Sequence, residues 1–139
     1  MQEVVKGMIG KELTNSLLRM LRDFRKLKYD IEEIYRNVKD LNDISIMGLY
    51  LLATEKNDNL AFYIKKSYDM VLNNRVNRFK KSIKDNSYID YLNSLNKTEV
   101  INMAYYMNLY DLSKKDYSLL NSLDKMYYRI LNNYIKNMI

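Results

Sequence analysis

The amino-acid sequence predicts an all-α fold, a single helical bundle of about six helices with two or three long helices. The 139 residues contain no proline and only three glycines, the two residue types that build most sheet-forming turns. Apolar residues make up 47% of the chain, which is enough to form a core. Over long stretches these residues recur every three or four positions, which is the spacing of one helix face.

A first long helix is predicted over residues 13–41, where apolar residues alternate at spacings of four and three. This heptad pattern is typical of a helix that buries one face, inside its own bundle or in a coiled coil with another chain. We favour packing within the bundle and keep the coiled coil as the alternative. The apolar positions are Leu13, Leu17, Met20, Phe24, Leu27, Ile31, Ile34, Val38 and Leu41.

The middle of the chain predicts a short buried helix followed by a second long helix. Residues 44–53 are apolar on nearly every side, which indicates a helix inside the domain. Residues 54–59 read TEKNDN and form the clearest loop. The second long helix is expected over residues 60–84, where apolar residues line one face, and the polar residues 85–87 end it.

A short helix over residues 88–95 is expected next, and it leads to a pattern that starts another helix. Asn96 is followed three residues later by Glu99, the arrangement of a capping box. We therefore predict a helix that begins after Asn96 and continues through Tyr110.

The last predicted helix covers residues 117–138 and is preceded by a second capping pattern, formed by Ser113 and Asp116. We expect residues 1–139 to form one all-α domain, in which residues 113–139 supply the C-terminal helix.

Composition argues against catalysis. The chain has neither histidine nor cysteine, which excludes a histidine base, a Ser-His-Asp triad, disulfides and thiolate or imidazole metal sites. No GxxxxGK or GxGxxG stretch is present to cradle phosphates. Carboxylate pairs at Glu32–Glu33 and around Asp40–Asp43 fit solvated helix faces. We expect no enzymatic activity, no cofactor and no metal.

Membrane insertion and export are not expected either. The longest apolar run, residues 46–53, is far shorter than a bilayer-spanning helix. The N-terminal residues contain the early acid Glu3 and lack the continuous apolar core of a secretory signal. We expect a cytoplasmic protein without a membrane partner.

Basic residues concentrate in the second long helix. Residues 65–84 contain seven lysines and arginines and one acid, Asp69, so their net charge of +6 equals that of the whole chain. All five lysines of this stretch fall opposite the apolar face, where they are either solvated or in contact with nucleic-acid phosphates. These candidate nucleic-acid contacts are Lys65, Lys66, Lys80, Lys81 and Lys84.

Arg75 is unusual because it falls within the apolar face of this helix, with Arg78 at the edge of that face. Burying an unpaired arginine is costly, so Arg75 should meet an acid or a carbonyl group, within the chain or on another subunit. Arginine and aromatic residues are enriched at interfaces. Together with the neighbouring Phe79, the two arginines are therefore candidate protein-interface residues.

Tyrosine is the main aromatic residue, with fourteen copies against three phenylalanines and no tryptophan. Most tyrosines must therefore lie in the core, with hydroxyl groups that reach its rim. Many cluster in the last third of the chain, Tyr105 and Tyr106 among them, away from the basic stretch. Any tyrosine that stays exposed favours a protein interface over base stacking.

The stretches NDNLAFYIKKSYDMVLNNRVNRF and LNKTEVINMAYYMNLYDL resemble the helical domain of GINS subunits of the DNA replication machinery, in the class whose helical domain comes first. In that class a long helix ends in two arginines and an aromatic residue. A helix start of the form leucine, small, any, acid then follows, with an aromatic-rich helix. The matching residues are Arg75, Arg78, Phe79, Leu95, Thr98, Glu99, Tyr105 and Tyr106.

The resemblance covers residues 1–112 and implies a non-catalytic scaffold in a hetero-oligomer of GINS subunits. Such a scaffold bridges the MCM helicase to its Cdc-type partner, with Arg75 and Arg78 stabilising subunit packing and the lysine face near DNA. It also makes Tyr105 and Tyr106 interface candidates. The chain departs from the family in ending with a helix instead of a small β-rich domain, and in lacking the usual acidic and proline content.

Two other classes remain open. The first is a small helical nucleic-acid-binding subunit, such as a small subunit of CRISPR effector complexes or a phage protein that blocks them. The second is a viral regulator with a groove for a partner's amphipathic helix, or a coiled-coil homodimer through residues 13–41.

Overall fold

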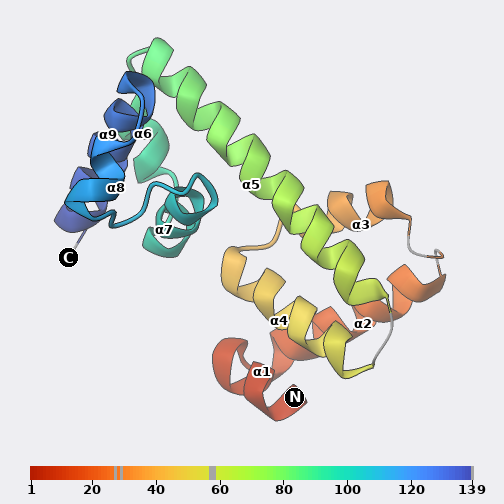
Figure 1. The fold of residues 1–139 in the computed structure, drawn as a ribbon. Helices are drawn as coiled ribbons and strands as arrows, with labels where there is room; N and C mark the ends of the chain where they lie inside the picture. The colour runs from red at the N-terminus through yellow and green to blue at the C-terminus, as the bar shows by residue number, and fades with distance from the viewer. Residues whose placement is uncertain (27, 29, 57–58, 139) are drawn as a thin grey trace. The chain divides into compact units, whose positions relative to one another are not determined.

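In the computed structural model the chain is helical, and the structure describes residues 1–26, 28, 30–56 and 59–138. Within these residues there are nine α-helices and no strands (Figure 1). The all-α prediction is confirmed, whereas the prediction of about six helices is wrong. None of the described helices combines the length and hydrophobicity needed to cross a membrane.

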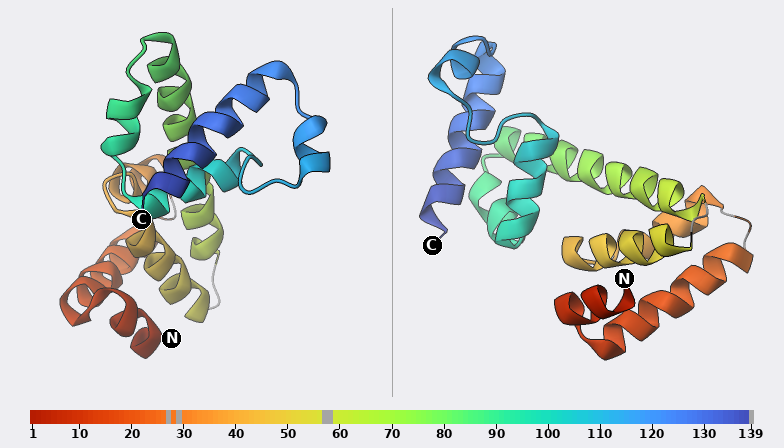
Figure 2. Two further views of the ribbon diagram at one scale, coloured as in Figure 1. Left: turned by 90° about the vertical axis from the view of Figure 1, so that its left-hand side faces the viewer. Right: turned by 60° about the horizontal axis from the view of Figure 1, so that its bottom comes forward.

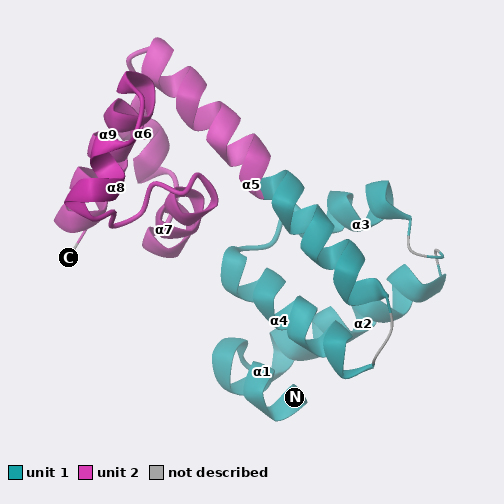
Figure 3. Cartoon of the chain, in the orientation of Figure 1, with its two compact units in different colours: residues 1–71 teal, residues 72–139 magenta. Residues whose placement is uncertain are grey.

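The chain forms two compact units, residues 1–71 and residues 72–139, here called unit 1 and unit 2 (Figure 3). The prediction of one domain over residues 1–139 stays a prediction. Each unit has its own hydrophobic core, and each is described separately below. Helix α5 contributes residues to both cores.

Unit 1 packs four helices and the first part of a fifth around a core of mainly leucine, isoleucine, valine and phenylalanine side chains. Its helices are α1 (Gln2–Ile9), α2 (Lys11–Lys26), α3 (Ile31–Val38), α4 (Asp43–Glu55) and the beginning of α5 (Leu60–Lys84). The predicted helices over residues 44–53 and 60–84 are confirmed as α4 and α5.

The single long helix predicted over residues 13–41 is wrong, because α2 and α3 are separated by a turn. Lys28 in this turn has a left-handed conformation (φ 53°) that a continuous right-handed helix does not contain. Asp30 then caps α3, since its Oδ1 atom accepts hydrogen bonds from the backbone N–H groups of Glu32 (3.0 Å) and Glu33 (3.4 Å). The heptad spacing runs across this cap and obscures it.

Most of the described apolar positions of the heptad pattern nevertheless pack inside unit 1, which supports the bundle interpretation, whereas Leu13 and Ile31 are only partly buried. Positions from both helices enter the same core, and Leu27 lies outside the described residues. The buried members are Leu17, Phe24, Ile34 and Val38, with Met20 and Leu41 packed against them.

Helices α1, α2 and α4 approach one another at Gly48, and α1 lies against α4 in both views of Figure 2. A Cβ atom on Gly48 would lie 3.2 Å from the Val5 Cγ1 atom and 3.3 Å from the Ile9 Cδ1 atom. These distances are shorter than ordinary van der Waals contacts between carbon atoms. The missing side chain of Gly48 therefore allows this close packing.

Unit 2 packs the remainder of α5 against four further helices, and Val76, Leu92 and Met103 are among the buried residues of its core. Its other helices are α6 (Tyr88–Asn93), α7 (Lys97–Tyr106), α8 (Lys114–Ser118) and α9 (Ser122–Asn137). The predicted helix over residues 88–95 is confirmed as α6. The helix predicted through Tyr110 ends earlier, at Tyr106.

The helix predicted over residues 117–138 is wrong, because two helices replace it. The Ser113 cap is confirmed, since its Oγ atom accepts a hydrogen bond from the Asp116 N–H (3.1 Å), but it opens only the short α8. Asn121 then caps α9 by accepting a hydrogen bond from the Asp124 N–H (2.8 Å). This second polar cap is a sequence signal for the break.

Side chains of α9 fix the loop between α7 and α8. Asn132 donates a hydrogen bond to the Leu109 carbonyl oxygen (2.7 Å) and accepts one from the Asp111 N–H (3.1 Å). The Tyr128 hydroxyl accepts a hydrogen bond from the Leu112 N–H (3.1 Å). Asp111 has a left-handed conformation (φ 49°), so its backbone groups cannot bond within a helix. The loop is therefore bonded at its start to the end of α7, through the Leu109 N–H and the Ala104 carbonyl (2.8 Å), and farther along to side chains of α9.

Candidate functional site

Arg75 is buried in unit 2, with 7% of its side chain exposed. Its Nη1 atom donates a hydrogen bond to the Glu99 carbonyl oxygen (3.2 Å), and its Nη2 atom lies 3.5 Å from the Glu99 Oε2 atom. The prediction that Arg75 meets an acid or a carbonyl group is confirmed, because Glu99 supplies both. This pair links α5 to the start of α7.

Glu99 also starts α7, through the capping box that the sequence predicts. Its Oε1 atom accepts a hydrogen bond from the Asn96 N–H (2.9 Å), while the Asn96 side chain accepts one from the Glu99 N–H (2.9 Å). The two oxygen atoms of one carboxylate thus have different partners, the helix cap and Arg75. Glu99 therefore belongs both to the capping box of α7 and to the contact between α5 and α7.

Tyr91 attaches α6 to the same point, because its hydroxyl donates a hydrogen bond to the Arg75 carbonyl oxygen (3.2 Å). Burial raises the pKa of Tyr91 above its usual value of 10.0, although the charges of Arg75 and Arg78 act to lower it. Three helices therefore meet around Arg75, whose described contacts lie within unit 2.

The structure places Phe79 in the core, which corrects its assignment as an interface residue. Its side chain is fully buried, and its ring lies 5.9 Å from the ring of Tyr127 on α9. Phe79 follows Arg75 by four residues, so both face inward on α5. Arg78, on another side of the helix, is exposed and is available to a partner.

Tyr105 and Tyr106, at the end of α7, are exposed by 60% and 40%. The centroids of the Tyr105 and Tyr110 rings are 4.4 Å apart, so the two rings support one another. Tyr110 lies beyond the end of α7 and is partly buried, so we call Tyr105 and Tyr106 alone the α7 tyrosines. They form an exposed aromatic surface on a helix that the Arg75–Glu99 pair holds in place.

All five predicted nucleic-acid contacts are exposed, as the helical spacing predicts. Lys65 and Lys66 belong to unit 1, whereas Lys80, Lys81 and Lys84 belong to unit 2. Two of them lie over aromatic rings at 5.4 Å, Lys66 over Phe62 and Lys80 over Tyr127. Contact with nucleic acid stays a prediction for all five lysines.

Charge is distributed unequally between the units. Unit 2 contains eleven basic and six acidic residues, a net charge of +5, whereas unit 1 contains twelve basic and eleven acidic residues, a net charge of +1. Within the described residues no group of three or more acidic side chains is placed to hold a metal ion. The net positive charge is therefore concentrated in unit 2.

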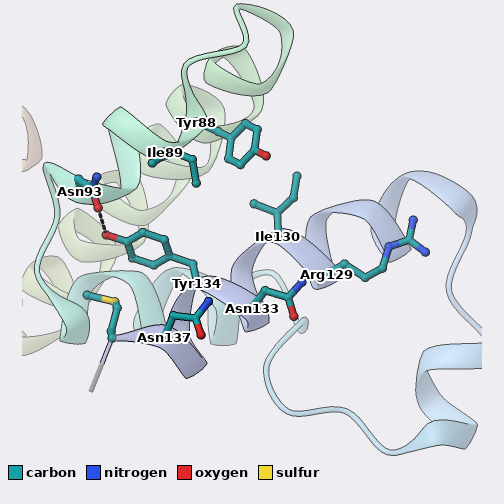
Figure 4. Close-up of a pocket in the computed structure, with 9 residues that line it drawn as sticks. Tyr88, Ile89, Asn93, Arg129, Ile130, Asn133, Tyr134 and Asn137 are labelled. Atoms are coloured by element: carbon teal, nitrogen blue, oxygen red, sulfur yellow. Dashed lines mark hydrogen bonds between the residues drawn. The ribbon is translucent and has the colours of Figure 1, made fainter.

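A groove between α6 and α9 was not predicted from the sequence. It has a volume of about 490 Å³, and Ile89 and Asn93 face Tyr134 across it (Figure 4). The Tyr134 hydroxyl donates a hydrogen bond to the Asn93 Oδ1 atom (2.5 Å). One sequence pattern could have indicated this groove: polar residues recur every four positions on the last helix, at Arg129, Asn133 and Asn137.

Comparison of the chain with protein-family models, curated proteins and solved structures finds no match.

Proposed function

We propose that the chain is a non-catalytic scaffold subunit that assembles with other proteins through the α7 tyrosines. The observation that carries this proposal is the exposure of Tyr105, a residue that is 60% exposed to solvent at the end of a well-anchored helix. Tyrosine is enriched at protein interfaces because its large amphipathic ring buries much area at little cost in conformational entropy.

The buried contacts beneath the tyrosines support this proposal. The Arg75–Glu99 pair and the Tyr91 hydrogen bond join α5, α6 and α7, so the aromatic surface is held rigid before a partner arrives. A pre-organised surface binds more tightly, because less conformational entropy is lost on association. In this proposal Arg75 acts through Glu99 and does not itself contact the partner.

The more specific form of the proposal is a GINS-type subunit of a replicative helicase assembly. It is supported by the resemblance of the two sequence stretches, in which Arg75 and Arg78 match the paired arginines of the family. Of these two, Arg78 is exposed and would contact a sister subunit, while Arg75 stabilises the helices behind it.

A second candidate function is contact with nucleic-acid phosphates, and the net charge of +5 on unit 2 favours it. Lys80, Lys81 and Lys84 are exposed on one helix and require no base specificity to bind a phosphate backbone. This function is compatible with a scaffold that works at a replication fork.

The scaffold proposal is tested by tagged co-purification from the native host after nuclease treatment, with the bound proteins identified by mass spectrometry. The wild-type chain is compared with a Tyr105→Ala, Tyr106→Ala variant. Phe62→Ala is the matched control, because it removes an equally exposed aromatic side chain from unit 1.

We expect specific partners with the wild type and the control, and their loss with the tyrosine variant. Unchanged recovery with the tyrosine variant would contradict the role of the α7 tyrosines. Recovery of partners that are not helicase or sister GINS subunits would overturn the GINS form of the proposal.

The nucleic-acid candidate is tested by replacing Lys80, Lys81 and Lys84 with glutamate and titrating duplex DNA at several salt concentrations. If the lysines contact phosphates, binding weakens strongly and its salt dependence becomes less steep, while the helical circular-dichroism signal is unchanged. Lys114→Glu with Lys115→Glu, on α8, gives a control for general charge. Binding that is unaffected by the α5 changes would refute this function.

A further inference from the structure

We propose that the groove between α6 and α9 binds an extended, acidic segment of a partner protein. The groove lies within unit 2 and contains no residue of α7, so it is a second surface beside the α7 tyrosines. The proposal goes beyond the scaffold function because it specifies the chemistry and the conformation of the bound segment.

The polar edge of the groove is spaced to match an extended backbone. Arg129, Asn133 and Asn137 follow one another at intervals of four residues along α9 (Figure 4). Four residues of helix rise about 6 Å, and two residues of extended chain span about 6.6 Å. Each asparagine amide carries both a donor and an acceptor, so Asn133 and Asn137 can pair with alternate peptide units of such a segment.

Between this polar edge and α6 the groove is lined by Ile89, Ile130 and Tyr134, which can receive apolar side chains of the segment. Ile89 on α6 is 50% exposed, and Ile130 and Tyr134 project from α9 toward α6 in Figure 4. The hydrogen bond from Tyr134 to Asn93 joins the two walls. A volume of about 490 Å³ accommodates side chains of moderate size. Alternate residues of the bound segment should therefore be apolar.

Charge indicates that the other residues of the segment are acidic. Arg129 is the basic residue among those that line the groove, none of the described lining residues is acidic, and unit 2 carries a net charge of +5. Arg129 donates one hydrogen bond to the Tyr117 hydroxyl (3.3 Å), which leaves other guanidinium donors for a carboxylate. A carboxylate of the segment would thus bind Arg129, at one end of the row that Asn133 and Asn137 continue along α9.

A single-stranded nucleic acid fits the groove less well than a peptide. Such a strand needs a basic track along its phosphates and open aromatic faces for its bases. The groove offers one arginine, and the rings of Tyr88 and Tyr134 are partly buried. The side-chain amides of Asn133 and Asn137 each offer a donor and an acceptor, which suits peptide groups better than phosphates.

The proposal is tested on the full chain by fluorescence anisotropy with a labelled peptide in which aspartate alternates with isoleucine. We expect saturable binding, weakened about tenfold or more by Asn133→Ala with Asn137→Ala, because hydrogen bonds to the peptide are lost. Both asparagines are exposed helix residues, and alanine favours the helix, so the fold should be retained. Asn73→Ala with Asn77→Ala, on α5, is the matched control and should leave the affinity unchanged.

The proposal would be overturned if binding of the aspartate-isoleucine peptide did not saturate by about millimolar concentration, which is already weak for a protein complex. It would also be overturned if a lysine-isoleucine peptide bound equally well, or if the asparagine variant bound the aspartate-isoleucine peptide as tightly as the wild type. Binding of oligothymidine that is lost in the same variant, in place of peptide binding, would assign the groove to nucleic acid. The Tyr105→Ala, Tyr106→Ala variant should keep full peptide affinity, so failure of the scaffold proposal is distinguishable from failure of this one.

Discussion

The two units stabilise their helices in different ways. In unit 1, α1 and α4 approach closely at Gly48, and the core is filled by aliphatic side chains and Phe24. In unit 2, buried or partly buried polar side chains link the elements: Arg75 joins α5 to α7, Tyr91 joins α6 to α5, and Asn132 joins α9 to a loop.

The difference follows from the length and regularity of the elements. Unit 1 is held mainly by apolar packing, and the Tyr68 hydroxyl adds a hydrogen bond between helices by donating to the Oδ2 atom of the buried Asp43 (3.1 Å). Unit 2 contains short helices and a loop with left-handed residues, whose backbone groups need partners from elsewhere. Tyr128 and Asn132 supply such partners, which explains part of the polar and aromatic bias of the last third of the chain.

The largest expected effect compares the two cores through matched phenylalanines. Phe24 in unit 1 and Phe79 in unit 2 are both buried, so each change to alanine should lower the free energy of unfolding by about 4 kcal/mol. Urea denaturation followed by circular dichroism measures the loss, and hydrogen exchange shows which unit loses protection. Phe62→Ala, on the surface, should change stability by less than about 0.5 kcal/mol. A much smaller loss for Phe79 would indicate that unit 2 is loosely packed.

The next effect concerns the buried ion pair of unit 2. Arg75→Met should cost about 3 kcal/mol, because the Glu99 carboxylate and carbonyl lose a buried partner. The control is Arg36→Met in unit 1, where the pair with Glu33 (2.8 Å) is exposed and worth less than about 1 kcal/mol. Similar losses in the two variants, measured by urea denaturation, would contradict the distinction between the units.

The close helix approach in unit 1 is tested at Gly48. Gly48→Leu should destabilise by about 2 kcal/mol, because the added side chain must displace Val5 and Ile9. Gly7→Ala is the matched control on α1, since a Cβ atom there meets nothing within 4 Å and should stabilise the helix by up to about 1 kcal/mol. Thermal unfolding measures both changes, and a neutral Gly48→Leu variant would show that the helices can separate without cost.

The smallest effect concerns Tyr91 and carries a pH signature. Tyr91→Phe removes the hydrogen bond to the Arg75 carbonyl and should cost about 1 kcal/mol near neutral pH. The folded state raises the pKa of Tyr91 above 10.0, so its stabilising contribution is complete below pH 10.0 and is lost as the pH rises through the raised pKa. The difference in unfolding free energy between wild type and variant should therefore shrink above pH 10. A difference that is constant with pH would contradict this role.

Patterns local to one helix were predicted from the sequence. The bounds of α5, the capping box of Asn96 and Glu99, and the need of Arg75 for a partner all follow from spacing and residue type. The break between α2 and α3 was missed because the apolar spacing continues across Asp30 while the backbone turns. At this position the apolar spacing predicts a continuous helix and Asp30 predicts a new helix start, and the structure follows the Asp30 cap.

For the candidate site, the sequence identified the exposed lysines and the tyrosine cluster but not their arrangement. Phe79 and Arg78 differ by one position, yet one is core and the other surface, because the helix face decides exposure. The groove between α6 and α9 combines residues about forty positions apart, and the Tyr134 to Asn93 hydrogen bond spans 41 positions.

The sequence by itself determined the helical class, the charge concentrated in α5 and the absence of histidine and cysteine chemistry, because these depend on composition and on spacing within one turn of helix. Only the tertiary structure decided which residue Arg75 meets, which tyrosines stay exposed and that a groove forms beside α9. Those features depend on which helix faces come together. Packing between elements distant in sequence selects these faces, and no local pattern encodes that choice.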